Sequence, residues 1–346
     1  VTTRVDTLRL LRHIDNIGGS RVRVIVHDTK LFSDEAERAT ERFDITPRTV
    51  QAVEGGRMTV DEIYMGVSMR SGPNEEVIEF IDRGTPVAYE LVRTVRAVTR
   101  AERKTVGILQ TDLPVMGRFD MQSMQRTPDW QIVSELRSQY DVVPVQPEEL
   151  FESQIDVLIA PLPSSLTQPQ MDMLGQYVQT GGPTLMLLDP YPVMAPMLSP
   201  QMPKQTPGQN PMMQQQRQQK GNIQAMLQSI GVSWDPGSIV WDTYNPVRRV
   251  AEQPPEVVFI SDKSGASEAF NPDVRITSGL ERVVLILGGE LRKSPGSPVE
   301  FTPLMRTSEE SGLVNWMSLQ QGRGVEHVPT PRSEEHTSEL QSLLII

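Results

Sequence analysis

The sequence contains no cysteine and few aromatic residues. None of its 346 residues is cysteine, and Phe, Trp and Tyr together make up 5%. The absence of thiols excludes disulfides, thiolate zinc sites, iron–sulfur clusters and cysteine nucleophiles. It leaves the cellular compartment open, because a protein without thiols suits any redox environment.

The sequence also has no excess of positive charge and no long apolar run. Lys and Arg number 33 against 44 Asp and Glu, for a net charge of −11, so a nucleic-acid partner has little electrostatic support. No stretch approaches the roughly 20 apolar residues of a membrane-spanning helix, and no signal-peptide pattern occurs. Because Val1 already lies in an amphipathic helical pattern, we expect the natural protein to continue upstream.

Length and composition predict two globular domains. We expect an N-terminal α/β unit over residues 1–102 and a larger α/β domain over residues 103–331. Within the second, residues 191–219 are rich in Pro, Met and Gln and predict a mobile insertion. The tail at residues 332–346 is interpreted as artefact, since RSEEHTSELQS resembles the translation of a sequencing adapter; we expect the natural sequence to stop near Pro331.

The predicted elements of the first unit are helices and short strands. Alternating apolar residues predict a strand over residues 22–28, and Ser33 is the expected N-cap of a helix that ends near Phe43. Further strands are expected on both sides of a turn at Gly55–Gly56 and of a hairpin turn over residues 71–74. A helix is expected after Pro86.

Alternating strands and helices in the second domain predict a doubly wound, mostly parallel sheet. Short apolar runs near residues 104–112, 141–147, 156–163 and 183–190 are typical of parallel strands covered on both faces. The later runs 238–244, 256–261, 280–291 and 301–308 also resemble strands, and we expect them to extend the same sheet.

Ligands of open α/β sheets usually lie at the carboxyl ends of the strands. The polar residues just past those ends are Asp112, Ser164, Ser165 and Asp189. Asp112 and Asp189 could act as acids or metal ligands, and the two serines as nucleophile or anion ligands. The alternative for each is a cap or a turn hydrogen bond.

Other catalytic signatures do not occur. No Gly-x-x-x-x-Gly-Lys-Ser/Thr phosphate loop, Gly-x-Ser-x-Gly elbow or His-Glu-x-x-His motif is found, so we expect no metal and no cofactor. Trp234 and Trp241 could stack on a sugar or a peptide, and their alternative role is core packing.

One long region resembles a known family. The strings EIYMGVSMRSGPNEEVIEFIDRG, PVAYELVRTVRAVTRAERKTVGIL and DVLIAPLPSSLTQPQMDMLGQYVQTGGPTLMLLDP are similar to the GldG family, the gliding-motility-type auxiliary components of ABC transporters. The resemblance covers nearly all of residues 1–331. It implies a bacterial, extracytoplasmic subunit at the cell membrane beside an ABC permease and its ATP-binding subunit, with membrane anchors outside this sequence.

The resemblance also implies a fold. The larger domain would resemble glutamine-amidotransferase-like or flavodoxin-like sheets, and the first unit a thioredoxin-like arrangement with Ile45-Thr46-Pro47 before a strand. Amidotransferase chemistry needs a cysteine that the chain lacks. We therefore expect a non-enzymatic scaffold that works through protein–protein contacts. The alternative is a domain that binds a small ligand such as a carbohydrate, or a cryptic hydrolase, with the four crevice residues.

Overall fold

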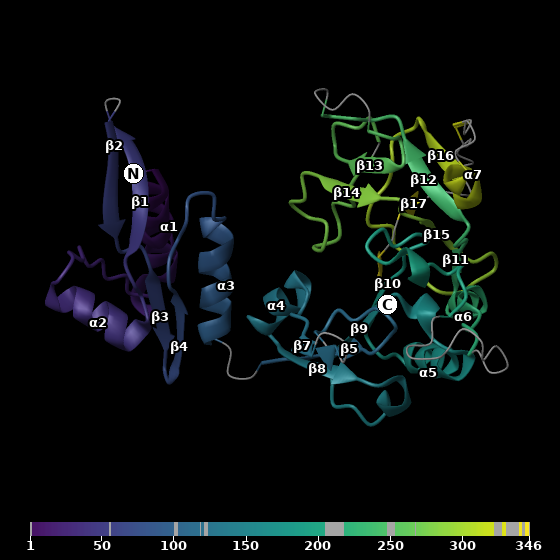
Figure 1. The fold of residues 1–346 in the computed structure, drawn as a ribbon, viewed down its shortest axis with the longest axis horizontal. Helices are drawn as coiled ribbons and strands as arrows, with labels where there is room; N and C mark the ends of the chain where they lie inside the picture. Colours follow the sequence, from purple (N-terminus) through teal and green to yellow (C-terminus); the bar gives the residue numbers. More distant parts are fainter. Residues whose placement is uncertain are drawn as a thin grey trace. The chain divides into compact units, whose positions relative to one another are not determined.

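The computed structural model describes most of the chain in two compact units, Val1–Arg103 (unit 1) and Lys104–Ile346 (unit 2) (Figure 1). The described residues are 2–54, 57–99, 103–117, 119–120, 124–204, 218–247, 253–266, 268–321, 327–329, 339–340 and 343–345.

Unit 1 combines helices with two separate β-hairpins. Its elements are α1 (Thr2–Gly18), a 3₁₀ turn (Gly19–Arg21), α2 (Asp34–Phe43), β1 (Arg48–Glu54), β2 (Arg57–Ile63), β3 (Val67–Ser71), β4 (Asn74–Ile78) and α3 (Val87–Thr99). Ser33 caps α2, because its Oγ accepts a hydrogen bond from the Ala36 N–H at 3.2 Å. The predicted hairpin turn is confirmed, since Ser71 pairs with Asn74. The predicted Gly55–Gly56 turn lies outside the described residues.

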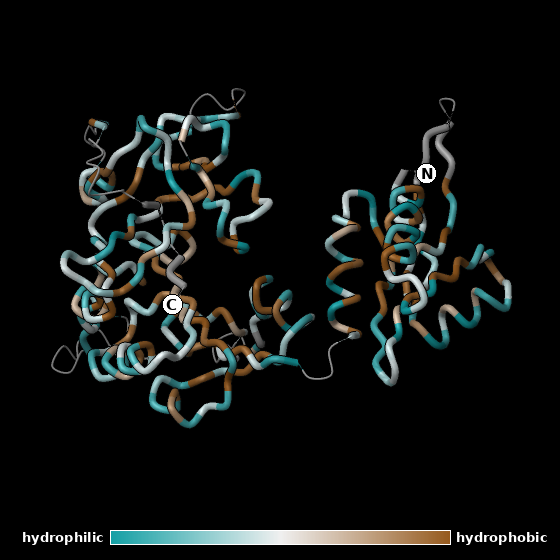
Figure 2. The backbone as a smooth tube through the Cα atoms, turned by 180° about the vertical axis from the view of Figure 1, so that it is seen from behind, coloured by the Kyte–Doolittle hydropathy of each residue, from teal (hydrophilic) through white to brown (hydrophobic). Residues whose placement is uncertain are grey.

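The core of unit 1 lies between its helices and the second hairpin. Hydrophobic and hydrophilic segments alternate along α3 (Figure 2), and its apolar face contacts β3, β4 and α1. Leu91 of α3 is fully buried and packs with Ile78, Ile81 and Leu10. Burying a leucine side chain stabilises a fold by about 2 kcal/mol, so this cluster fixes the two helices on the hairpin.

The strand predicted over residues 22–28 is wrong. These residues form no strand, and the side chains of Ile25 and Val26 are 62% and 55% exposed. Alternation of apolar residues is typical of a strand, but a strand also needs a neighbour to take its backbone hydrogen bonds. None of the described strands pairs with this segment.

Unit 2 contains a parallel sheet, as predicted. Its strands lie in the order β18-β10-β9-β5-β8, in which the four from β10 to β8 run parallel. The bounds are β5 (Thr105–Leu109), β8 (Asp141–Val145), β9 (Val157–Pro161), β10 (Thr184–Leu187) and β18 (Leu343–Ile345). Numbered along the chain, the parallel strands have the order 2-1-3-4, which is that of flavodoxin-like sheets.

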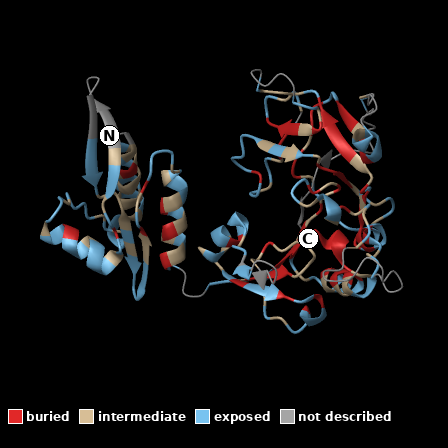
Figure 3. Ribbon diagram, in the orientation of Figure 1, coloured by how far each residue is buried: buried red, intermediate tan, exposed pale blue. Residues whose placement is uncertain are grey.

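Helices cover both faces of this sheet, which confirms the doubly wound layout. The helices are α4 (Gln131–Arg137), α5 (Gln168–Gln179) and α6 (Ile223–Ser229). On β9, Leu158 packs with the residues of α5 and α6, whereas its neighbour Ile159 packs with Val133 of α4. Successive side chains of a strand point to opposite faces. The continuous apolar run of β9 therefore serves two cores, and Figure 3 shows buried residues both in the parallel sheet and in the antiparallel strands β12 (Ser238–Asp242) and β13 (Val257–Ile260).

The later strands do not extend the parallel sheet, so that prediction is wrong. They form small antiparallel pairs, β11 with β15, β12 with β16 and β13 with β14. Their bounds are β11 (Val232–Trp234), β12 (Ser238–Asp242), β13 (Val257–Ile260), β14 (Val283–Ile286), β15 (Glu290–Lys293) and β16 (Ser311–Asn315). In the described residues from β11 to β16 no helix intervenes. Parallel strands need crossover connections whose helices cover the sheet, so antiparallel pairing is the solution that remains.

Two further apolar runs behave differently from the predictions. The run 280–291 divides into β14 and β15, because Gly288 and Gly289 interrupt it and Leu287 adopts a left-handed φ of 55°. The run 301–308 forms no strand and contributes an isolated bridge between Met305 and Phe270.

The remaining elements are short. They are β6 (Phe119–Asp120), β7 (Gln125–Arg126), α7 (Trp316–Gln320), β17 (Glu339–Leu340) and 3₁₀ turns at Pro147–Glu149, Pro163–Ser165 and Pro196–Leu198. The turn at Pro196–Leu198 lies in the segment predicted to be a mobile insertion, and Ser199 beside it is fully buried. Residues 205–217 of that segment lie outside the described part of the chain.

Candidate functional site

The candidate site lies where β5 and β9 end. These strands are neighbours in the sheet, but the chain leaves β5 toward β8 on one side and leaves β9 toward β10 on the other. Ligand crevices of doubly wound sheets open at such a reversal of strand order. The segments that follow the two strands are 110–112 and 162–165.

Two of the predicted residues meet at this point. The Asp112 N–H donates to Ser165 Oγ at 3.2 Å, and that hydroxyl donates to the carbonyl of Leu162 at 3.0 Å. Beside them, Thr111 Oγ1 donates to the carbonyl of Pro161 at 2.7 Å. The hydroxyls of Thr111 and Ser165 therefore join the ends of β5 and β9 to each other.

A lysine that the sequence did not indicate occupies the reversal point. Lys204 Nζ donates to both carboxylate oxygens of Asp112, at 2.9 and 2.8 Å, and to the carbonyl of Ser165 at 2.7 Å. The Lys204 side chain is 9% exposed and that of Asp112 26%. An ammonium group has three N–H donors. Lys204 uses all three in hydrogen bonds to the Asp112 carboxylate and the Ser165 carbonyl.

A second lysine holds the same segment. Lys220 Nζ donates to the carbonyls of Leu198 and Ser199, at 3.0 and 2.6 Å, and Ser199 Oγ donates to the carbonyl of Pro190 at 2.8 Å. Burial lowers the pKa of Lys220 to about 8; the negative charge of Asp112 opposes this shift and the positive charge of Lys204 adds to it. The segment from Pro190 to Lys204 is thus fastened at its start, middle and end.

Ser164 does not join the Asp112 cluster. Its side chain is buried, and its Oγ has no hydrogen-bond partner among the described residues. An unsatisfied buried hydroxyl costs free energy, and the Ser164 side chain contributes no hydrogen bond that would offset this cost.

Asp189 has the turn role that was its alternative. It follows β10, and its Oδ1 accepts a hydrogen bond from the Tyr191 N–H at 2.8 Å. Burial raises the pKa of Asp189 to about 6, although this hydrogen bond acts in the opposite direction. Within the described part of the chain, no hydrogen bond or ion pair joins Asp189 to Asp112 or to either serine.

The two candidate tryptophans are core residues. Trp234 and Trp241 are buried, so neither ring is open for stacking on a sugar. Trp241 lies edge-to-face with His327, whose Nε2 is 2.8 Å from Glu256 Oε1. Among the described residues, no three His, Asp or Glu side chains are grouped so as to hold a metal ion.

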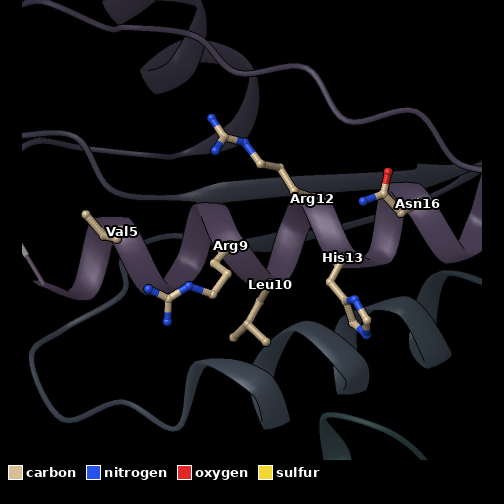
Figure 4. A pocket seen from close by; sticks show the side chains of 6 residues that line it. All are labelled: Val5, Arg9, Leu10, Arg12, His13 and Asn16. Carbon is tan, nitrogen blue, oxygen red and sulfur yellow. The ribbon is translucent and has the colours of Figure 1, made fainter.

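Unit 1 contains a separate groove on α1. It is lined by Val5, Arg9, Leu10, Arg12, His13 and Asn16, all from that helix. Leu10 and His13 point toward the neighbouring helix, whereas Arg12 points away from it (Figure 4). These side chains do not converge on one point, so the groove has no catalytic geometry.

Comparison with known proteins matches unit 2 to a family. A model of the auxiliary family described as "ABC-type uncharacterized transport system" matches residues 103–341. The chain belongs to this ABC-transport auxiliary family. No curated protein and no solved structure matches the chain.

Membership in the ABC-transport auxiliary family gives the site its context. The match begins at the boundary between the two units and includes all the crevice residues and Lys204. The protein is therefore an auxiliary component of an ABC transport system. Among the described residues, no helix combines the length and the apolar composition needed to cross a bilayer.

The two lysines of the crevice were missed for an identifiable reason. Lys204 lies 92 residues from Asp112, in a segment whose Pro, Met and Gln content predicts irregular structure. No periodic pattern marks such a long-range partner. The available signal was charge: Lys204 and Lys220 are the only lysines between residues 105 and 262.

Proposed function

We propose that the protein is a non-enzymatic scaffold subunit of its ABC transport system, of the GldG type, on the extracytoplasmic face of a bacterial membrane. It acts through contacts with the permease and the ATP-binding subunit, and its membrane anchors lie outside this sequence. Residues 103–331 form the auxiliary domain, and the resemblance to gliding-motility components supports this assignment.

The observation that carries the proposal is the filled crevice. A ligand at the reversal of β5 and β9 would have to displace the Lys204 ammonium from three oxygen acceptors. The carboxylate of Asp112 already forms an ion pair with Lys204, and the Ser165 hydroxyl already donates to a backbone carbonyl. A catalytic serine would instead donate its hydroxyl hydrogen to a general base, and neither Lys204 nor Asp112 accepts it here. The chain also has no thiol that could replace them as a nucleophile.

The test is association with the transporter. The tagged chain is co-expressed with a permease and an ATP-binding subunit from the same source DNA, the membranes are solubilised, and the recovered subunits are quantified by mass spectrometry. We expect both subunits in a constant ratio to the chain. Recovery of an intact permease–ATPase pair without the chain would contradict the proposal.

A second function is favoured by one observation, the unpartnered hydroxyl of Ser164. In this alternative the crevice binds a small ligand such as a carbohydrate, or hydrolyses an ester. Hydrolysis of p-nitrophenyl acetate by the whole chain, lost on Ser164→Ala but retained by Ser278→Ala on an exposed loop, would support it. Equal rates for the three proteins would remove it.

A further inference from the structure

Strand β14 has an open edge. It pairs with β13 alone, in a sheet of these two strands. On the opposite side of β14, no described residue forms a strand ladder with it. An open edge presents unpaired N–H and C=O groups to any other strand that approaches.

The register shows which residues present these groups. The Leu287 N–H donates to the carbonyl of Glu256 at 3.0 Å, so this pair is a hydrogen-bonded one. Hydrogen-bonded and non-hydrogen-bonded pairs alternate along an antiparallel ladder. Val284, opposite Phe259, and Ile286, opposite Val257, are therefore non-hydrogen-bonded, and their N–H and C=O groups point away from β13.

The same two residues expose apolar side chains. Val284 is 46% and Ile286 55% exposed, whereas Val283 and Leu285 pack against the core formed by Val258 and its neighbours. Open edges are usually protected by lysine, proline or a bulge. From 283 to 289 the sequence is VVLILGG, with no charge and no proline, so the edge carries no such protection.

We propose that β14 is a self-association surface and that a second copy of this chain covers it. Two β14 strands run antiparallel about a two-fold axis at Leu285, so that Val284 of each copy lies opposite Ile286 of the other. Both residues of each pair have outward backbone groups, as a hydrogen-bonded pair requires. Isologous pairing of this kind is the usual symmetry of homodimers. The two sheets join into one, β13-β14-β14-β13.

A second copy is favoured over an unrelated strand because two-fold pairing places exposed apolar side chains opposite each other along an edge without charge. Val284 and Ile286 lie symmetrically about Leu285, so one edge satisfies the other without a shift in register. The four apolar side chains also come together on one face of the joined sheet. This proposal does not depend on the scaffold function.

The test is the mass of the full chain in solution. Sedimentation equilibrium over a concentration series is expected to show a dimer of the 38.8 kDa chain. The double variant Val284→Lys with Ile286→Lys places like charges opposite each other across the axis, and we expect it to remain monomeric. The corresponding double Glu variant is also expected to be monomeric alone, and a mixture of the two should restore the dimer.

Controls separate this edge from other causes of association. Val92→Lys on α3, where Val92 is 48% exposed, should leave the dimer intact, and so should Leu344→Glu in the apolar tail. Far-ultraviolet circular dichroism checks that the variants are folded. A wild-type chain that is monomeric throughout, or a dimer that survives the double Lys variant, would overturn the proposal. So would a dimer lost with Leu344→Glu alone.

Discussion

At the residue scale, Lys204 is the group on which the account of the crevice depends. It is nearly buried and contacts Asp112 and the carbonyl of Ser165. Removing one partner of such a pair leaves the other without compensation, which costs more than the pair itself contributes.

We expect Lys204→Met to lower the free energy of unfolding of unit 2 by about 2 kcal/mol, measured by urea denaturation. The matched control is Lys104→Met. Lys104 also forms a short ion pair, at 2.6 Å with Asp156, but its side chain is exposed, and exposed pairs contribute little. Equal effects of the two substitutions would contradict the buried role of Lys204.

Asp189 gives a prediction with a defined pH dependence. Its pKa in the folded protein is about 6, against an ordinary value of 3.8. Between these values the folded state binds more protons than the unfolded state, so stability falls as the pH rises from about 4 to about 6. Above about pH 6 the carboxyl group is charged in both the folded and the unfolded state, so the free-energy cost of burying its charge no longer changes with pH.

Asp189→Asn keeps an oxygen that can accept the Tyr191 N–H and removes the charge. We expect it to raise the free energy of unfolding by about 2 kcal/mol at pH 7 and to flatten the dependence between pH 4 and 6, in thermal melts across this range. Asp273→Asn, at an exposed residue, is the control for charge removal alone. A variant that is less stable than the wild type at pH 7 would show that the carboxylate is needed in its charged form.

At the element scale, the sequence correctly predicted the caps, turns and strands that depend on residues close together in the chain. The cap at Ser33, the turn at 71–74 and the apolar runs of β5, β8, β9 and β10 all appeared as expected. Pairing between distant segments was less predictable. Residues 22–28 have the pattern of a strand but pair with none of the strands that the structure describes, and β13 and β14 pair with each other rather than with the parallel sheet.

In the candidate site, too, some contacts were predictable from the sequence and others were not. Asp112 and Ser165 were predicted to meet because the carboxyl ends of adjacent parallel strands lie together. Lys204 and Lys220 were not predicted, because the contacts that hold them join segments far apart in the sequence. Asp189 was a candidate for the crevice, and its oxygen instead serves the turn to Tyr191.

The adapter-like tail gives a prediction at this scale. Leu343–Ile345 pairs with the edge of β10, and Glu339–Leu340 pairs with β15. An open strand edge can pair with an apolar segment whatever the origin of that segment. The two ladders here are short, with three residue pairs to β10 and two to β15. We expect a chain that ends at Pro331 to unfold cooperatively, with a free energy of unfolding within about 1 kcal/mol of the longer chain. Loss of cooperative thermal unfolding would show that the tail belongs to the fold.

At the scale of the whole molecule, the family and the crevice support the same conclusion. The chain belongs to an auxiliary family of ABC transport, and its parallel sheet keeps the layout of ligand-binding folds while its own lysine fills the crevice. The central claim is that the protein contributes to transport through contacts and not through reactive side chains.

The most direct test is the rate of ATP hydrolysis by the permease and ATP-binding subunits, measured alone, with the wild-type chain, and with the double variant Ser164→Ala and Asp189→Asn. The account predicts that the wild type changes the rate and that the double variant changes it equally. A wild type without effect, or a double variant that binds but no longer changes the rate, would contradict it.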